Sequence, residues 1–527
     1  MKEKRIAIVI ENNQEYIRRI GIEEKKFAPE MFRFYDSLSN VYLPLLDMCE
    51  RFEKNGEPFH LALVMPSSFC TLLSDETIQK QYVSHLEKCL ALGKHEKARL
   101  AKSKERLALA NFYVERIQKL IHQYRNVYHC NLLEQFRIHA KAGSLELLAT
   151  CATHIYLPHY EEMSEVVNAQ IETGLYAHKT FFGENVHGFW IPELAYFGGL
   201  EKSLLQYGVQ WTVLDARSFL FSNDEIANGI FSPCIAGDGL AVFARDNRIQ
   251  KEFSAYAKNE CYVDINRDID YELSLSDLQT YVSSSSPRYP SPFLYWSKTK
   301  GSLPNRSYNF GIANEQCKID ANDFISKKSE LLETVLQKLP TENATLVASF
   351  SVDDFLNEWK EGIYFLENVF AFSKNAGLSL SSFNELLSNK KTLQTISPYE
   401  ASGSGWGYGE NLVSHKNNWM MLHIKKASER MIDLAGRFPD DVGLNARLLN
   451  LASRELMLAQ SSLLAKMIDD GRFAPFAKMR FCESVESFTK VFEALGSGNV
   501  STEWLTAREA SHPIFPWIHY HIFNKKK

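Results

Sequence analysis

The chain has 527 residues, of which 59 are Lys or Arg and 64 are Asp or Glu, so its formal net charge is −5. Its 45% hydrophobic and 23% charged content is close to the average for soluble globular proteins. Nothing in this balance points to nucleic acid or an anionic membrane as a partner, because both require clustered positive charge. The length exceeds the roughly 250–300 residues that one hydrophobic core usually holds, which favours more than one structural unit.

Apolar runs are short throughout the chain, and none approaches the ~20 residues that span a bilayer. The N-terminal run Ile6–Ile10 has five apolar residues, fewer than the about 7–15 of a secretory signal. The nine cysteines are scattered and form no C-x-x-C pair. We therefore expect a cytoplasmic protein with reduced cysteines and no membrane partner.

Short β-rich apolar segments alternate with helical stretches, the longest of which runs from Ser74 to about Lys141. The predicted strands are Ile6–Ile10, His60–Met65, Leu145–Ala149, Gly188–Ile191, Gln210–Leu214, Leu240–Phe243 and Thr345–Phe350. Such alternation predicts parallel pairing with right-handed crossovers. We expect an α/β fold, an irregular (β/α)7 TIM-like barrel over residues 1–395.

Residues 217–310 interrupt this pattern with the serine run Ser283–Ser286, Pro287 and several aromatic residues. A loop region of this length is usually functional or disordered, and both interpretations stay open. After Leu387 the chain becomes polar, is Gly-rich over 402–409, and then keeps only helical periodicity. Amphipathic segments near 415–437, 443–468 and 475–496 predict an all-α C-terminal domain over residues 396–527.

In parallel barrels the functional residues lie on the loops after the C-terminal ends of the strands. Those positions include Glu11, Asn13, His154, Glu193, Asp215, Ser351, Asp353 and Asp354. The set is rich in carboxylates and poor in His and Cys, which favours sugar chemistry over a metal centre. We expect no metal and no cofactor, since His154 has no second ligand at close spacing.

The segment 188–196, GFWIPELAY, places a carboxylate in an aromatic wall, which suits a cationic glycosyl transition state. It resembles the nucleophile motif of glycoside hydrolase family 57, in the α-1,4-glucan branching enzyme branch. Further segments resemble the family in the right order: ATHIYLP at 152–158, GVQWTVLD at 208–215, RELMLAQSS at 454–462 and IFPWIHY at 514–520. The resemblance implies that Glu193 is the nucleophile of a retaining mechanism; the alternative is a strand-end glutamate paired at the barrel rim.

The resemblance also implies an α-glucan or maltooligosaccharide as the partner, and it leaves a protein partner undefined. His154 is similar to a sugar-contacting histidine of the family, although hydrogen bonding to the strand ends is an equal alternative. Aromatic residues that could stack on glucose rings are Trp190, Tyr271, Trp406 and Trp419, of which Trp419 also fits a helix core. Glu11, Asn13 and Asp215 complete the expected substrate contacts.

The general acid of the family is an aspartate just after the seventh strand, in a pattern of the type D-x-E-x-F-G-H-W-W. Here residues 351–359 read SVDDFLNEW, which places Ser351 at the position of the acid. A serine hydroxyl cannot deliver a proton near pH 7, because its pKa lies far above that range. The first strand also departs from the family pattern, because Glu11 and Asn13 stand where the family has two histidines.

Two functions follow from these departures. The first is a branching-enzyme-like protein that acts on or binds α-1,4-glucans with lost or much reduced catalysis, and we favour it. The second is an active 1,4-α-glucan branching enzyme that takes its acid from Asp353, Asp354 or Glu11, each of which would have to lie about 5–5.5 Å from Glu193. Asp353 and Asp354 fit helix capping equally well. A polysaccharide deacetylase is set aside, because no Asp/His/His metal set can be assembled.

Overall fold

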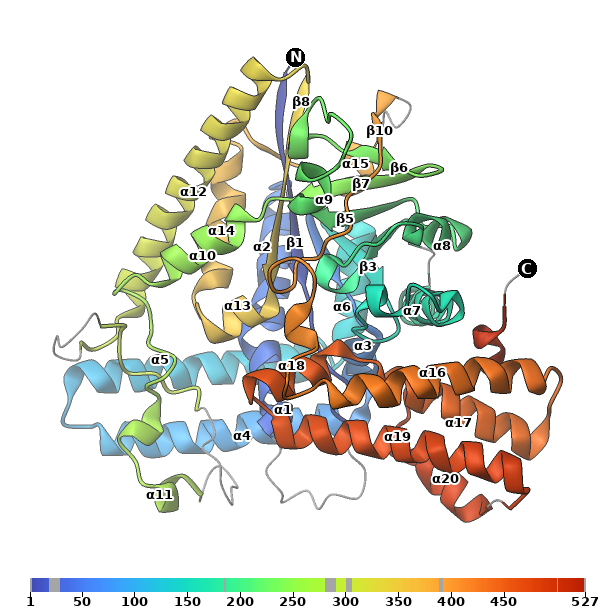
Figure 1. The fold of residues 1–527 in the computed structure, drawn as a ribbon. Helices are drawn as coiled ribbons and strands as arrows, with labels where there is room; N and C mark the ends of the chain where they lie inside the picture. Colours follow the sequence, from blue (N-terminus) through green and yellow to red (C-terminus); the bar gives the residue numbers. More distant parts are fainter. Residues whose placement is uncertain are drawn as a thin grey trace.

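The computed structural model describes residues 2–18, 29–183, 186–279, 291–299, 306–387, 392–499 and 501–525. A barrel of parallel strands lies at the centre, and a long helical hairpin and a layer of C-terminal helices lie at one end of it (Figure 1). The predicted serine run Ser283–Ser286 and Pro287 lie outside the described residues.

Seven parallel strands pair in the order β7-β5-β4-β3-β2-β1-β8, and a further β7–β8 pairing closes the barrel. Their bounds are β1 Glu3–Glu11, β2 Leu61–Val64, β3 Leu145–Thr150, β4 Gly188–Trp190, β5 Trp211–Asp215, β7 Leu240–Arg245 and β8 Asn343–Ser351. Each overlaps one predicted strand, so the predicted irregular (β/α)7 barrel is confirmed. Three short strands extend the sheet: β6 Cys234–Ala236, β9 Ser379–Leu380 and β10 Thr395–Ile396. These three strands were not predicted, because a segment of two or three residues is too short to show the alternating hydrophobic pattern of a strand.

Side-chain alternation fills both sides of the barrel wall. On β1, Ala7 and Val9 point into the barrel core, whereas Ile6, Ile8 and Ile10 belong to the outer core beneath the helices. The inner core also holds Trp190, Trp211 and Phe243, and the Trp211 ring stacks on Phe383 at 4.3 Å between centroids. The barrel is therefore packed through its centre, and chemistry is confined to its mouth.

Helices surround the barrel between consecutive strands. Around the first half lie α1 Pro29–Ser37, π-helix Leu38–Tyr42, α2 Leu43–Asn55, α3 Ser67–Ser74, α6 Leu132–Ala142, α7 Ser164–Phe182, α8 Leu200–Gln206 and α9 Ala216–Leu220. Around the second half lie α10 Arg248–Ala257, α11 Leu275–Gln279, α12 Phe310–Lys338, α13 Val352–Asn357, α14 Gly362–Ser373 and α15 Phe383–Leu386. Short 3-10 turns lie at Leu157–Tyr160, Pro192–Leu194, Gly229–Phe231, Ile269–Tyr271, Glu410–Leu412 and Tyr520–Phe523.

The predicted helical stretch from Ser74 to Lys141 contains a projecting hairpin. Its two arms are α4 Glu76–Arg99 and α5 Lys104–Ile121, and π-helix His122–Val127 leads from α5 toward α6. Asp75 caps α4 by accepting hydrogen bonds from the backbone N–H groups of Thr77 and Ile78. The hairpin lies below the barrel and beside the loops after β7 (Figure 1).

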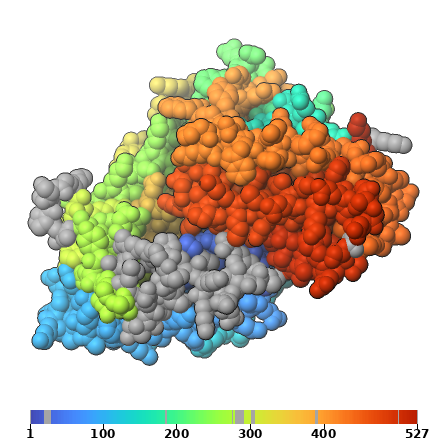
Figure 2. Space-filling model, turned by 60° about the horizontal axis from the view of Figure 1, so that its bottom comes forward, coloured from blue at the N-terminus to red at the C-terminus, as the bar shows by residue number. Residues whose placement is uncertain are grey.

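Helices α16 to α20 form the C-terminal layer, which crosses the barrel mouth (Figures 1 and 2). Their bounds are α16 Trp419–Arg437, α17 Gly443–Ala459, α18 Ser462–Asp470, α19 Ala474–Ser497 and α20 Thr502–Ser511. The helix predicted over 443–468 is two helices, because Ser461 leaves the helix and pairs with Ile155 of the barrel. Our proposed domain division after residue 395 falls within β10. No helix in the described part of the chain is long and apolar enough to cross a bilayer.

Candidate active site

Glu193 lies in a strained turn directly after β4. Its φ is 59° and that of Leu194 is 50°, a left-handed conformation that costs a non-glycine residue about 1–3 kcal/mol. The backbone N–H of Gly403 donates to the Glu193 carbonyl at 2.6 Å, and a Cβ built on Gly403 would lie only 3.2 Å from that oxygen. The Gly-rich segment thus holds the turn in place, and strain of this kind concentrates at functional sites.

The Glu193 carboxylate is 8% exposed and lies beneath α18. Lys466 of α18 donates to its Oε1, and Nδ1 of His154 lies 3.6 Å from the same oxygen. Burial by itself raises the pKa of Glu193, but the charges of Lys466 and then His154, together with hydrogen bonds from Lys466 and Ser404, lower it below its usual range. Because burial lowers the pKa of His154 to about 4, Lys466 is the cation that keeps Glu193 ionised at neutral pH.

Glu11 is the last residue of β1, and it pairs in register with Ser351 at the end of β8. Neighbours in a parallel ladder project to the same face, so the partly exposed Glu11 side chain lies beside the Ser351 side chain. Burial raises the pKa of Glu11, and the nearby charge of Glu193 raises it further, while Arg245 opposes both. Two adjacent carboxyls are therefore driven toward opposite protonation states, as an acid and a nucleophile require.

Ser351 begins α13 as its N-cap, with its hydroxyl accepting from the Asp353 N–H at 3.2 Å. Asp354 completes the capping box: its carboxylate accepts from the Ser351 N–H and from Gln250, each at 2.8 Å. Asp353 is ion-paired with Arg33 and accepts from the Asn357 amide at 3.2 Å. Both carboxylates thus have capping and pairing partners, and the geometry gives no support to either as a substitute acid.

Asp215 is fully buried at the end of β5. One carboxylate oxygen accepts from Arg245 at 2.7 Å, and the other accepts from Asn247 at 2.9 Å and Arg217 at 3.2 Å. It also caps α9 through the Arg217 N–H. These contacts make Asp215 an anchor for the two arginines, and its expected contact with substrate stays a prediction.

Of the predicted polar and aromatic contacts, His154 lies beside Glu193, and Asn13 and Trp190 share a small cavity with His154. His154 shares the Glu193 carboxylate with Lys466, and its Nδ1 lies 3.0 Å from the Ser462 hydroxyl of α18. Trp190 is in the inner core, and its indole N–H lies near Glu11 without a conventional hydrogen-bond partner in the described chain. Asn13, His154 and Trp190 line a cavity of about 10 Å³, which has room for about one water.

The remaining predicted aromatic residues differ in exposure and in their partners. Trp406 is 85% exposed on the Gly-rich segment and is free to stack on a sugar ring. Tyr271 is also exposed, with the Arg267 guanidinium 5.5 Å from its ring centroid. Trp419 packs edge-on against Phe481 at 5.1 Å within the C-terminal helices, as its helix-core alternative predicts.

Lys466, Gly403 and Ser404 also contact Glu193, and none of them was predicted from the sequence. Lys466 is one lysine among several on an amphipathic helix, and nothing local marks it as the partner of a residue 273 positions away. Gly403 and Ser404 lie in the Gly-rich segment that was noted for its composition only. In the described residues no three His, Cys, Asp or Glu side chains are grouped to hold a metal ion.

Family models match two parts of this chain. The model described as "Glycosyl hydrolase family 57" matches residues 7–350, which is more than half of the chain. The chain belongs to glycosyl hydrolase family 57. A second model, described as "1,4-alpha-glucan branching enzyme, C-terminal", matches residues 423–523. The resemblance drawn from the sequence is thereby confirmed.

The similar proteins include branching enzymes and an alpha-amylase. The 1,4-alpha-glucan branching enzyme TK1436 of Thermococcus kodakarensis is 23% identical over 520 residues, covering 90% of this chain and 71% of the relative. Among solved structures, the alpha-amylase AmyC of Thermotoga maritima is 26% identical, with a TM-score of 0.92 and full coverage of both chains. The family 57 branching enzyme of Pyrococcus horikoshii is 22% identical, with a TM-score of 0.88 and coverage of 99% and 97%. At 22% identity, the similarity to the Pyrococcus horikoshii enzyme shows a shared fold alone.

Proposed function

We propose that this protein binds α-1,4-glucans at the barrel mouth and that its retaining glycosyl transfer is much reduced. Family membership and the relatives named as branching enzymes and an α-amylase support the substrate class. Glu193, ionised beside Lys466, supports a surviving nucleophile. The observation that carries the reduced rate is that Ser351 caps α13, while Asp353 and Asp354 are engaged in the same helix start.

The chemistry explains why loss of the acid limits the rate. In the first step a Glu193 oxygen bonds to the anomeric carbon as the C1–O4 bond breaks, and the departing 4-oxygen must take up a proton. Ser351 cannot supply it, and loss of general acid catalysis costs about 10²–10⁴-fold. In the second step the 6-hydroxyl of another glucan, or water, attacks the glycosyl-enzyme and needs the same group as its base.

One observation favours the second candidate function, an active branching enzyme. Glu11 lies in register with Ser351, and its pKa is raised while that of Glu193 is lowered. Its side chain is one carbon longer than aspartate, so a carboxyl on β1 is suited to reach toward the space left by an acid on β8. Of the three substitute acids considered, Glu11 is the one favoured by its register with Ser351 and by its raised pKa.

The test is turnover of amylose by wild type, Glu193→Gln and Glu11→Gln, followed by iodine absorbance and by chain lengths after debranching. Maltopentaose binding by calorimetry is measured on the same proteins. We expect maltopentaose binding with slow or undetectable turnover in wild type. Rapid branching that both variants abolish would instead establish the second candidate, with Glu11 as the acid. Absence of maltopentaose binding would refute the proposed substrate class.

A further inference from the structure

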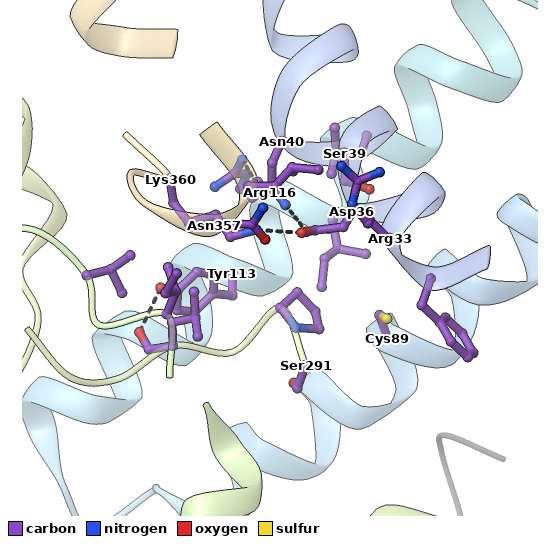
Figure 3. A pocket seen from close by; sticks show the side chains of 18 of the residues that line it. Arg33, Asp36, Ser39, Asn40, Cys89, Tyr113, Arg116, Ser291, Asn357 and Lys360 are labelled. Carbon is purple, nitrogen blue, oxygen red and sulfur yellow. Dashed lines mark hydrogen bonds and ion pairs between the residues drawn. The ribbon is translucent and has the colours of Figure 1, made fainter. Parts of the chain in front are cut away.

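A separate cavity of about 370 Å³ lies outside the Glu193 site, between the helical hairpin and the end of β8 (Figure 3). Its walls come from α1, α4, α5, the end of α13 with the start of α14, and the chain near residues 263–266 and 291–294. None of Glu193, Glu11, His154 or Lys466 lines it. Its volume lies toward the small end of the about 300–1,000 Å³ that is common for ligand pockets.

Among the described residues, four cationic side chains line this cavity: Arg33, Arg116, Lys360 and Arg472. Figure 3 shows Arg33, Arg116 and Lys360 grouped on one side together with Asp36 and Asn40. Lys360 is paired with Asp36 at 2.5 Å, and Arg33 is paired with Asp353. Asp36 and Asp353 are therefore each already paired with a cation.

The other two guanidiniums have neutral partners. Arg116 donates to the Asn40 amide oxygen at 2.7 Å, and Arg472 donates to the Asn357 amide oxygen at 2.8 Å. Within the described chain, neither has a carboxylate at ion-pair distance. Glu361 also lines the cavity, but one of its oxygens accepts from the Val263 N–H at 3.0 Å and burial raises its pKa.

Arg33 lies close enough to Arg472 for their charges to repel. Burial, and next the charge of Arg472, lower the pKa of Arg33 to about 10, while the charges of Asp36 and Asp470 oppose this shift. Like charges that face one another at a partly buried wall are unfavourable until an anion joins them. Guanidinium groups match phosphate oxygens in a bidentate geometry, which makes phosphate the anion that best fits this wall.

Aromatic rings form another part of the lining. The rings of Phe32, Phe112, Phe310, Tyr364 and Phe473 line the cavity, and those of Phe112 and Phe310 are stacked at 4.6 Å between centroids. Aromatic faces suit the apolar face of a sugar ring. Asp36, Asn40 and Asn357 already accept hydrogen bonds from the cations, so the acceptors beside the cationic groups are not free for the hydroxyls of a neutral glucan.

We propose that this cavity binds a small phosphorylated sugar, with its phosphate on Arg33, Arg116 and Arg472 and its ring against the aromatic wall. The ligand then competes with Asp353 for Arg33, and Asp353 lies in the first turn of α13, two residues beyond Ser351. Occupancy is thus coupled to the start of the helix that follows β8. The site does not depend on glucan turnover, so the two proposals can fail independently.

The test is calorimetric titration of glucose 6-phosphate into the full chain, with glucose and inorganic phosphate as separate probes. The variants are Arg472→Gln and the double variant Arg116→Gln/Arg472→Gln. The matched control is Arg125→Gln, an exposed arginine outside the cavity that is paired with Glu87. We expect wild type and the control to bind glucose 6-phosphate equally, and the double variant at least tenfold more weakly.

Arg472 is exposed, so its single variant is expected to fold and to show a several-fold loss of affinity by itself. Glucose is expected not to bind the cavity, and inorganic phosphate is expected to bind more weakly than the sugar phosphate. Absence of glucose 6-phosphate binding to wild type would overturn the proposal. Equal affinity in the double variant and the Arg125→Gln control, or equal affinity for phosphate and glucose 6-phosphate, would overturn it as well.

Discussion

Ser351→Asp returns a carboxyl to the end of β8, at the position where the family resemblance places the general acid. Ser351 accepts from the Asp353 N–H as the N-cap of α13, and aspartate is as good an N-cap as serine. The capping contribution to the free energy of unfolding should therefore change by about 0.5 kcal/mol or less. Asp354 is buried next to this position, so its charge raises the pKa of the new carboxyl and favours its protonated form.

The expected gain follows from what a general acid contributes. A positioned acid is worth about 10²–10⁴-fold, or about 2.7–5.4 kcal/mol of activation free energy. Amylose turnover by Ser351→Asp should exceed that of wild type within this range, and Glu193→Gln in the same background should abolish the gain. Iodine absorbance and release of reducing ends measure branching and hydrolysis separately.

Ser351→Asn is the matched control, because it caps the helix and fills a similar volume but carries no acidic proton. If Ser351→Asp turns over amylose no faster than Ser351→Asn, the missing acid is not what limits this site. That result would refute the assignment of Ser351 to the acid position. A gain that survives Glu193→Gln would refute the role of Glu193 instead.

Three further predictions concern stability. Lys466→Met should lower the free energy of unfolding by about 1–3 kcal/mol, because it leaves the buried Glu193 carboxylate without its cation; in urea titrations Lys466→Met/Glu193→Gln should recover most of that loss, and no recovery would contradict the pairing. Burial raises the pKa of Glu15 to about 6, so folding favours its protonated form, and this stabilisation is full below about pH 4.5 and lost as pH rises through 6. Relative to Glu15→Gln, the free energy of unfolding of wild type should therefore fall by about 2 kcal/mol between pH 4 and pH 7. If the stabilities of the two proteins depend on pH in the same way, the raised pKa of Glu15 is contradicted. Gly174→Ala should cost about 3 kcal/mol or more, because its Cβ would lie 2.0 Å from the Thr150 carbonyl oxygen; Gly436→Ala, with nothing within 4 Å, should cost nothing, and equal thermal stability of the two would contradict the close α7–β3 packing.

The barrel could be predicted from the sequence because its seven strands are apolar runs long enough to show periodicity. Most of the resemblance motifs lie on those strands, directly after them or on α17, and one follows α20, so the family could be recognised even at low identity. The strands β6, β9 and β10 have too few residues for any pattern, and the break between α17 and α18 depends on a contact of Ser461 with Glu15 and Ile155. Both features depend on tertiary contacts that no local pattern carries.

The candidate site could be predicted only in part, for the same reason. Glu11, Glu193 and Ser351 were found because the ends of the strands can be predicted from the sequence. The pKa values of Glu11 and Glu193 depend on neighbours from other elements, which the sequence does not reveal. Lys466 reaches Glu193 from the C-terminal helices, and Arg33 holds Asp353 from α1. The sequence left capping and catalysis open for Asp353 and Asp354, and the contacts of Ser351 and Gln250 favour capping.

The most direct test of an intact nucleophile without its acid is turnover of α-maltotriosyl fluoride. Fluoride leaves without protonation, so a site that lacks only the general acid still forms the glycosyl-enzyme from this substrate. We predict that wild type releases a rapid burst of about one fluoride per protein chain, followed by slow release because the second step lacks its base, and that Glu193→Gln shows no burst. Equal fluoride release by wild type and Glu193→Gln would contradict the central claim that Glu193 remains a working nucleophile.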